Sequence, residues 1–424
     1  MKLVPQPNLL GEPLLAGVAS SGLRVLVNPR PGWARSFAAL GVNFGSIDRA
    51  DGGAPVPEGL AHFLEHKLFE DQAGDVSDRF ATLGASTNAM TGFTTTTYVM
   101  STVESPGESL DLLLDFVQDP WFTDALVAKE QGIIAQEIRM YDDDPEWRLF
   151  FGLMGCLYER HPVKDNIAGS VESIAAIDAA VLRRIYQRFY HPRNLCLAVC
   201  SPLPPEEIAA RVEADQAGRP SDERPEHARA GFDEPEARCR ERVELRLPVA
   251  RPRLLLGIKD RSDGRGGADL LRRELVTRIL LDALLGPSSS AYERLYEQGL
   301  VDETFSASYS AEASFGFSTI GGDTDDPDAL EAALREVLRR AREQGVDPAA
   351  FRRVRNKLHG ALLRAMDSPE SVALTLVGET LRGVPAFTEL SLFDTLSPQD
   401  IDRRLQEHVR DEALAVSVVR PLEA

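Results

Sequence analysis

Residues 62–66 read His-Phe-Leu-Glu-His, which places two imidazoles and a carboxylate at helical spacing. His62 and His66 are four residues apart, so on a helix they lie on one face about one turn apart, and Glu65 shares that face. Two imidazoles can bind a zinc ion, and a carboxylate beside them can take a proton from zinc-bound water. H-x-x-E-H is the inverse of the H-E-x-x-H zinc motif. We therefore predict a zinc site at His62 and His66, with Glu65 as the general base.

The alternative is an accidental match on a surface helix, and the neighbouring residues argue against it. The segment has an apolar helical face formed by Leu60, Phe63, Leu64, Leu68 and Phe69. Two histidines and a glutamate in such a segment are costly to bury without a metal ion or polar partners. The apolar surroundings therefore favour a metal site.

A two-histidine site needs a third protein ligand and an open position for water. The best candidate lies in the predicted helix 124–141, where Glu130 and Glu137 are seven residues apart and share a face. Three isoleucines indicate that much of this helix is buried: Ile133, Ile134 and Ile138. A buried glutamate needs a metal ion or a hydrogen-bond donor. The alternative is a pair of solvated glutamates, which is common on any helix.

Composition limits the class of protein. The 424 residues are too many for one ordinary core, so two or three domains are expected. The net charge of −19 argues against binding to nucleic acid and to anionic membrane surfaces. Because no signal peptide pattern and no apolar run of membrane-spanning length occur, we expect a cytoplasmic protein. The four cysteines contain no C-x-x-C motif, which favours reduced thiols over a structural zinc site.

Hydrophobic periodicity and turn residues predict a mixture of strands and helices. We expect strands at 23–28, 37–45, 94–102 and 195–200, and helices at 57–70, 109–117, 124–141, 146–158 and 171–189. Residues 217–237 are charged, contain proline and are nearly free of large apolar groups, which is typical of a linker. We therefore predict an N-terminal domain at 1–216 and a C-terminal domain at 238–424.

The two halves have a similar order of elements. Segment 254–260 can be laid on 39–45 as a strand, and 276–285 on 60–69 as the following helix. In that overlay the metal motif meets residues that do not form a zinc site: His62 meets Arg278, Glu65 meets Leu281 and His66 meets Asp282. The second domain is therefore predicted to be a structural copy without the metal.

H-x-x-E-H followed some seventy residues later by E-x6-E resembles the M16 (pitrilysin/insulysin) metallopeptidase family, which includes the mitochondrial processing peptidases. The longer runs EGLAHFLEHKLFE, GASTNAMTGFTTTTY and KEQGIIAQEIRMYDDDPEWR resemble the bacterial YmfH-like branch of that family. The resemblance implies that His62, His66 and Glu137 bind one Zn²⁺ and that Glu65 is the general base. It also implies that Glu130 supports the site without touching the metal.

The spacing of the third ligand departs slightly from the common family pattern. In many members the last ligand lies a few residues farther from the motif, which would correspond to Asp142–Asp144 here. We prefer Glu137 because the E-x6-E pair and its helix match the family. The aspartates stand at a helix end before Pro145, where a solvated stop is expected.

The resemblance also implies an Arg and a Tyr from the second half that stabilise the oxyanion. Arg294 and Tyr309 are the nearest candidates, but their spacing does not match the common pattern. The alternatives are an ordinary surface arginine and a tyrosine at the edge of a core. If neither residue serves, a partner chain would have to supply these donors.

Asn88 and Ala89 resemble a family segment beside an edge strand, where a peptide substrate binds as an added strand. The alternative is a plain turn into the strand 94–102. A substrate-binding role is the interpretation that we favour.

The resemblance implies an α+β fold with two homologous domains, each a largely antiparallel β-sheet with helices packed on one face, which enclose a chamber. The expected function is zinc-dependent endopeptidase activity on short or unfolded peptides. A homodimer, or a heterodimer with an M16 partner that lacks the motif, is expected. The alternative is a non-catalytic or partner-dependent structural subunit, but all four motif residues are retained, and this favours an enzyme.

Overall fold

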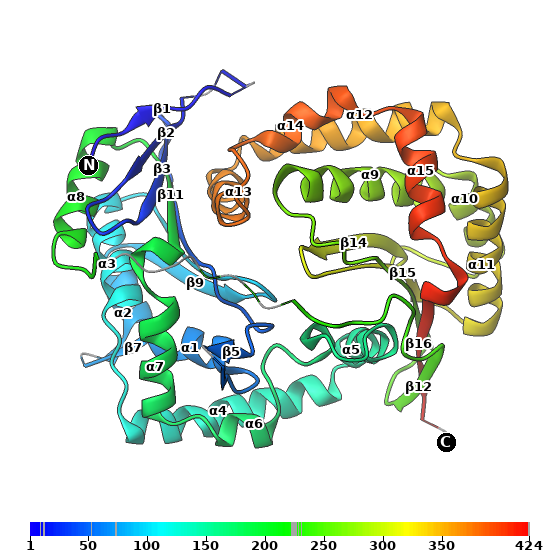
Figure 1. Ribbon diagram of the computed structural model, residues 1–424, viewed down its shortest axis with the longest axis horizontal. Coiled ribbons are helices and arrows are strands. Elements are labelled where there is room, and N and C mark those ends of the chain that lie inside the picture. The colour runs from blue at the N-terminus through cyan, green and yellow to red at the C-terminus, as the bar shows by residue number, and fades with distance from the viewer. Residues whose placement is uncertain are drawn as a thin grey trace. The chain divides into compact units, whose positions relative to one another are not determined.

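The computed structural model describes residues 1–8, 10–11, 13–51, 53–72, 74–221, 227, 229 and 231–422. The chain forms two compact units, each built from separate stretches of sequence (Figure 1). Unit 1 comprises Met1–Ile138, Asn166–Ala230 and Leu363–Thr388. Unit 2 comprises Arg139–Asp165, Gly231–Leu362 and Glu389–Ala424.

Unit 1 is built on a sheet that has seven strands in the described residues, in the order β1-β2-β3-β11-β4-β10-β9. Their bounds are Val4–Pro5 (β1), Leu15–Val18 (β2), Arg24–Pro29 (β3), Ser36–Val42 (β4), Ala85–Thr91 (β9), Thr96–Thr102 (β10) and Leu195–Ser201 (β11). β3 and β11 run parallel, and the other neighbouring strands of this sheet run antiparallel. β4 and β11 are buried along their whole length, so they form the centre of the sheet.

Helices surround this sheet, together with two short hairpins. The helices are Leu60–Leu68 (α1), Val76–Thr82 (α2), Pro106–Gln118 (α3), Asp124–Asp143 (α4), Val171–Ala175 (α6), Ala179–Phe189 (α7), Pro205–Gln216 (α8) and Pro369–Leu381 (α13). The hairpins pair Ala50–Asp51 (β5) with Ala54–Pro55 (β6), and Glu70–Asp71 (β7) with Gly74–Asp75 (β8). α1 and α2 pack against β9, and α3 packs against β10. These contacts place the metal-motif helix α1 beside the sheet edge.

Unit 2 repeats the design with a sheet of five strands in the described residues, in the order β12-β16-β13-β15-β14. The strands are Arg242–Leu247 (β12), Arg253–Lys259 (β13), Ser306–Glu312 (β14), Phe315–Asp323 (β15) and Leu414–Pro421 (β16). The helices are Pro145–Leu157 (α5), Gly267–Leu285 (α9), Ser290–Glu297 (α10), Pro327–Gln344 (α11), Pro348–Ala365 (α12), Thr388–Leu392 (α14) and Pro398–His408 (α15). Among the strands described for this sheet, β12 and β16 run parallel, and the other neighbouring pairs run antiparallel. The predicted α+β fold with two largely antiparallel sheets is confirmed.

Each sheet carries a helix from the other half of the sequence on its second face. In unit 2, Leu254, Leu256 and Ile258 of β13 enter the core that α9 and α11 help to form. Alternate residues of a strand face opposite sides, and Gly257 faces Leu153 of α5. In unit 1, Gly41 of β4 faces Val377 of α13. A glycine at each of these positions lets the helix approach the strand closely.

Most predicted elements occur within a few residues of their expected bounds. Segment 171–189 differs, because it forms two helices, α6 and α7, instead of one. Asp178 caps the start of α7 by accepting a hydrogen bond from the backbone N–H of Val181 at 2.7 Å, and so a new helix begins there. The domain bounds on either side of the linker 217–237 stay a prediction. The compact units differ from them in two helices, because α5 belongs to unit 2 and α13 belongs to unit 1. We call this the exchange of α5 and α13.

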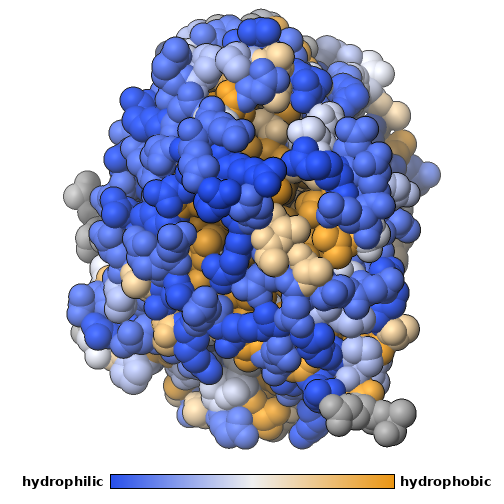
Figure 2. Space-filling model, turned by 90° about the vertical axis from the view of Figure 1, so that its right-hand side faces the viewer, coloured by the Kyte–Doolittle hydropathy of each residue, from blue (hydrophilic) through white to orange (hydrophobic). Residues whose placement is uncertain are grey.

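Figure 2 shows that hydrophilic residues cover most of one face of the molecule, with apolar side chains scattered between them. This agrees with the high charge of the chain. None of the described helices is long and apolar enough to cross a membrane.

We expect Gly41→Ala to destabilise unit 1. A Cβ atom at residue 41 would lie 2.3 Å from Cγ1 of Val377, so α13 would have to move away from the sheet. Such overpacking costs about 1–3 kcal/mol of unfolding free energy, which thermal and urea unfolding can measure. Adding Val377→Ala should restore part of the loss. Gly132→Ala is the control, because nothing lies within 4 Å of a Cβ there. Equal stability of Gly41→Ala and wild type would contradict the close approach.

Candidate metal centre

Helix α1 holds the two histidines in a buried position. Gly59 precedes it with φ 79°, a left-handed conformation that glycine adopts without strain, and a Cβ there would lie 2.3 Å from the carbonyl oxygen of Ala168. Every residue of α1 is buried or half-buried. The rings of His62 and His66 lie side by side with centroids 4.5 Å apart, as their four-residue spacing predicts. A polar face inside a packed core requires partners.

Helix α4 supplies the carboxylates that meet this face. Thr123 precedes α4 and accepts a hydrogen bond from the backbone N–H of Leu126 at 3.3 Å, as expected of its predicted N-cap role. Glu137 places Oε1 3.7 Å from Nε2 of His62 and Oε2 3.5 Å from Nε2 of His66. Ligand atoms of these three residues all lie within 4.8 Å of one another.

This donor set fits a zinc ion. Two donors bound at about 2 Å to one tetrahedral zinc ion lie about 3.3 Å apart, close to the distances between Glu137 and the histidines. The Nδ1 atom of His62 is buried and has no hydrogen-bond partner among the described residues. A neutral ring that carries its proton on this Nδ1 atom has its lone pair on Nε2, the atom that faces Glu137. Burial, together with the charge of His66, lowers the pKa of His62 to about 4, so the ring is neutral at pH 7 and can act as a ligand.

Glu130 orients the second histidine from the same helix. The Nδ1–H group of His66 donates to Oε1 of Glu130 at 3.0 Å. A neutral imidazole that donates from Nδ1 has its lone pair on Nε2, the atom that faces Glu137. Burial alone would lower the pKa of His66, but the hydrogen bond to Glu130 and the charge of Glu137 outweigh it and raise that pKa. Hydrogen bonds of this kind fix the ring orientation of metal-binding histidines.

The alternative ligands lie elsewhere. Asp144 accepts hydrogen bonds from the backbone N–H groups of Glu146 and Trp147, at 2.8 and 3.0 Å, and so caps α5. In the part of the chain that the structure describes, the aspartates 142–144 are not members of the His62, His66 and Glu137 cluster. Their place at a helix end agrees with the solvated stop that the sequence predicts.

Glu65 receives a hydrogen bond from a residue that the sequence analysis missed. The hydroxyl group of Thr91, at the end of β9, donates to Oε2 of Glu65. Burial raises the pKa of Glu65 above its ordinary value, and the hydrogen bond from Thr91 opposes that rise. The carboxylate therefore has one oxygen fixed on the strand, in a partly desolvated site suited to a general base. No spacing rule indicates Thr91, because 26 residues separate the two side chains.

Asn88 and Ala89 lie within β9 and not in a turn beside a strand. They pair with Val99 and Tyr98 of β10, and β9 is the outermost strand of the sheet in the described residues. The side chain of Asn88 is exposed, and its Oδ1 accepts the backbone N–H of Ala89 at 2.9 Å. The same strand that holds Thr91 therefore ends the sheet.

The two residues predicted to stabilise an oxyanion occupy different surroundings in unit 2. Arg294 is exposed on α10. Tyr309 of β14 is 8% exposed, and its hydroxyl group donates to Oδ2 of Asp260. Burial raises the pKa of this hydroxyl group. Both places agree with the structural alternatives named from the sequence, a surface arginine and a buried tyrosine.

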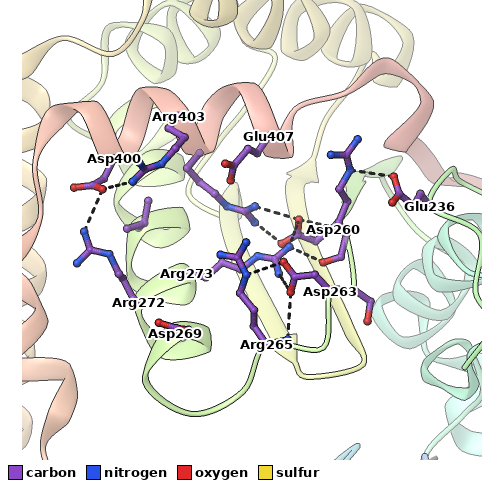
Figure 3. A pocket seen from close by; sticks show the side chains of 14 residues that line it. Glu236, Asp260, Asp263, Arg265, Asp269, Arg272, Arg273, Asp400, Arg403 and Glu407 are labelled. Carbon is purple, nitrogen blue, oxygen red and sulfur yellow. Dashed lines mark hydrogen bonds and ion pairs between the residues drawn. The ribbon is translucent and has the colours of Figure 1, made fainter. Parts of the chain in front are cut away.

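Asp260, the partner of Tyr309, also contacts two arginines. Asp260 and Arg273 line a pocket of about 370 Å³ (Figure 3). Arg404 donates to Oδ1 of Asp260 at 3.2 Å, and Arg273 lies 2.8 Å from the same oxygen. Burial opposes ionisation of Asp260, but His408 and Arg404 outweigh it and hold the pKa of the carboxyl well below its usual range. Six arginines and six carboxylates line the pocket, so its charges compensate one another.

Comparison with known proteins relates the whole chain to one family. Residues 24–171 match the family model described as Insulinase (Peptidase family M16), and residues 176–358 match that of the Peptidase M16 inactive domain. The uncharacterized zinc protease YmfH of Bacillus subtilis is 40% identical over 418 residues, which cover 97% of each chain. The uncharacterized zinc protease YmxG of the same organism is 25% identical over 367 residues, which cover 83% of this chain and 84% of YmxG.

Solved structures of M16-like and other proteases share the fold of this chain along nearly its whole length. The crystal structure of an M16-like peptidase from Alicyclobacillus acidocaldarius covers 99% of this chain and 100% of its own, with a TM-score of 0.94 and 38% identity. A protease from Helicobacter pylori shares the fold with a TM-score of 0.84 at 17% identity, over 99% of this chain and 100% of its own.

We expect Asp260→Asn to destabilise unit 2 by about 3–5 kcal/mol, because the buried Arg404 would lose its counter-charge. Thermal and urea unfolding measure the change. The matched control is Asp263→Asn, whose carboxylate pairs with Arg273 at 3.2 Å but is more exposed, and which should cost about 1 kcal/mol or less. If both variants unfold like wild type, Asp260 does not hold this cluster.

Proposed function

Because this chain belongs to the M16 peptidase family, we propose that it is a zinc-dependent endopeptidase that cleaves short or unfolded peptides. The convergence of His62, His66 and Glu137 carries the proposal, since their ligand atoms lie within 4.8 Å of one another beside Glu65. A protein that only recognised peptides would have no use for this combination of donors and base.

The residues of the centre divide the chemistry among them. His62, His66 and Glu137 would hold the ion, and Glu130 keeps the ring of His66 turned toward it. When bound, zinc supplies a Lewis acid that polarises the scissile carbonyl group and acidifies a water molecule. Glu65 removes a proton from the attacking water and then delivers it to the leaving amine nitrogen. Thr91 binds the carboxylate of Glu65 and so fixes its orientation for these transfers.

The substrate would bind along β9. The outer edge of this strand can hydrogen-bond an extended peptide through main-chain groups, with Asn88 and Ala89 in the middle of the strand. Thr91 is at the end of the same strand and contacts Glu65. A peptide added to β9 would therefore have its backbone in register with the residue that holds the base.

The two residues predicted to stabilise the oxyanion, Arg294 and Tyr309, occupy positions that do not suit this role. The hydroxyl group of Tyr309 is already bound to Asp260, and Arg294 is an exposed residue of α10. A second chain, either another copy or an M16 partner without the motif, would then contribute such donors. The chamber and the cytoplasmic location stay predictions.

The second candidate function is a structural subunit without chemistry. It is favoured by the place of Tyr309, whose hydroxyl group is bound to Asp260. The intact set of His62, Glu65, His66 and Glu137 favours the enzyme, because a scaffold needs none of them.

We expect the purified chain to bind about one zinc ion and Glu137→Gln to bind zinc more than about 100-fold more weakly, since it replaces an anionic ligand by a neutral amide. Competition with a chromophoric chelator gives the affinity, and mass spectrometry gives the metal content. The matched control is Asp143→Asn, at the end of the same helix, which should bind zinc like wild type. If Glu137→Gln keeps full zinc affinity and Asp143→Asn loses it, the third ligand is one of the aspartates at the end of α4 and not Glu137.

We expect Glu65→Gln to keep zinc and to lower kcat for peptide cleavage by about 10²–10⁴-fold, the usual contribution of a general base. The assay follows cleavage of a mixture of unfolded peptides by mass spectrometry, with the chain alone and with candidate partner chains. Glu58→Gln, a half-exposed glutamate just before the helix, is the control and should cleave normally. Undiminished cleavage by zinc-loaded Glu65→Gln would exclude Glu65 as the base. A zinc-loaded wild type that cleaves nothing under either condition would favour the structural subunit.

A further inference from the structure

Lys67 directly follows the zinc motif and is completely buried, although none of the steps above uses it. Its side chain is 0% exposed in the middle of unit 1. Its Nζ atom lies 2.6 Å from Oε2 of Glu70 and 4.0 Å from Oε2 of Glu130. A buried ammonium group is costly unless carboxylates compensate it, so these two contacts define its role.

Glu70 and Glu130 differ in what else they contact. Glu70 is also bound by Lys129, whose Nζ atom lies 3.0 Å from Oε1, and this second pair is at the surface. Glu130 is buried, and its other oxygen accepts the hydrogen bond from Nδ1 of His66. Lys67 therefore binds Glu70 directly at 2.6 Å, and its charge acts on Glu130 over 4.0 Å.

The charges of the centre also require a cation at this position. Three carboxylates, Glu65, Glu130 and Glu137, surround the two imidazoles. A divalent ion would leave one negative charge in a largely buried site. Glu70 adds a second, and Lys67 and Lys129, which both pair with Glu70, supply the two positive charges that balance them. Uncompensated charge in such a site would repel Glu130 from its place beside His66.

We propose that Lys67 is a positioning residue of the metal centre that acts through Glu130. Its ammonium group attracts Oε2 of Glu130, which directs Oε1 to Nδ1 of His66 and the lone pair of Nε2 to the metal. The inference rests on the zinc site of the proposed function. It adds a residue that touches neither the metal nor the substrate.

The test measures zinc affinity in Lys67→Met, which removes the charge and keeps an unbranched apolar chain. We expect the dissociation constant for zinc to rise about 10–100-fold, the usual effect of losing a partner behind a metal-binding histidine. Lys129→Met is the matched control, because it removes the other cation from Glu70 at an exposed position and should leave zinc affinity unchanged. Wild-type affinity in Lys67→Met would overturn the proposal. A wild type that binds no zinc would instead overturn the proposed function.

A double-mutant cycle shows whether the effect passes through Glu130. In a Glu130→Gln background, Lys67→Met should cause little further loss of zinc affinity, because the group through which it acts is gone. An equal loss in both backgrounds would overturn the proposal and indicate a general effect of folding. Cobalt-loaded Lys67→Met should also show a changed visible absorption spectrum, since His66 would be oriented differently. If Lys67→Met does not fold, Lys67→Gln, which keeps a polar partner for Glu70, takes its place in the cycle.

Discussion

The burial of polar side chains on α1 is the constraint on which unit 1 depends. His62 and Lys67 are buried in a helix whose apolar residues pack into the core, and His66 is half-buried. Each polar group must therefore have a partner, and α4 and β9 supply most of them as Glu137, Glu130 and Thr91. The core thus fixes the positions of the candidate ligands, as a catalytic centre needs.

The same residues connect the base to the expected substrate strand. Glu65 is bound by Thr91 at the end of β9, and Asn88 and Ala89 occupy the middle of that strand. A peptide that adds to an edge strand takes its register from the strand's own hydrogen bonds. A single strand would therefore set both the position of the scissile bond and one oxygen of Glu65, so that substrate register and proton transfer share one rigid element.

Local periodicity made part of this structure predictable. Helical spacing identified His62, His66, Glu130 and Glu137, because residues four and seven apart share a helix face in any fold. Thr91 could not be found this way, since its contact with Glu65 depends on how a strand meets a helix. The partners of Lys67 were hidden for the same reason, because Glu130 is on another helix. The exchange of α5 and α13 left no sequence signal, because an amphipathic helix has the same pattern whichever sheet it covers.

The exchange also divides α4, the helix that supplies the candidate third ligand. α4 carries Glu130 and Glu137 in unit 1, while its last turn belongs to unit 2 and leads through the cap at Asp144 into α5. α5 is anchored by packing on β13 and β16, where Gly257 admits Leu153. The helix that supplies the third ligand therefore continues along the chain from unit 1 into unit 2. Since Glu137 must lie within a few ångströms of both imidazoles, the order of the candidate metal centre depends on how α4 packs beside α1 within unit 1.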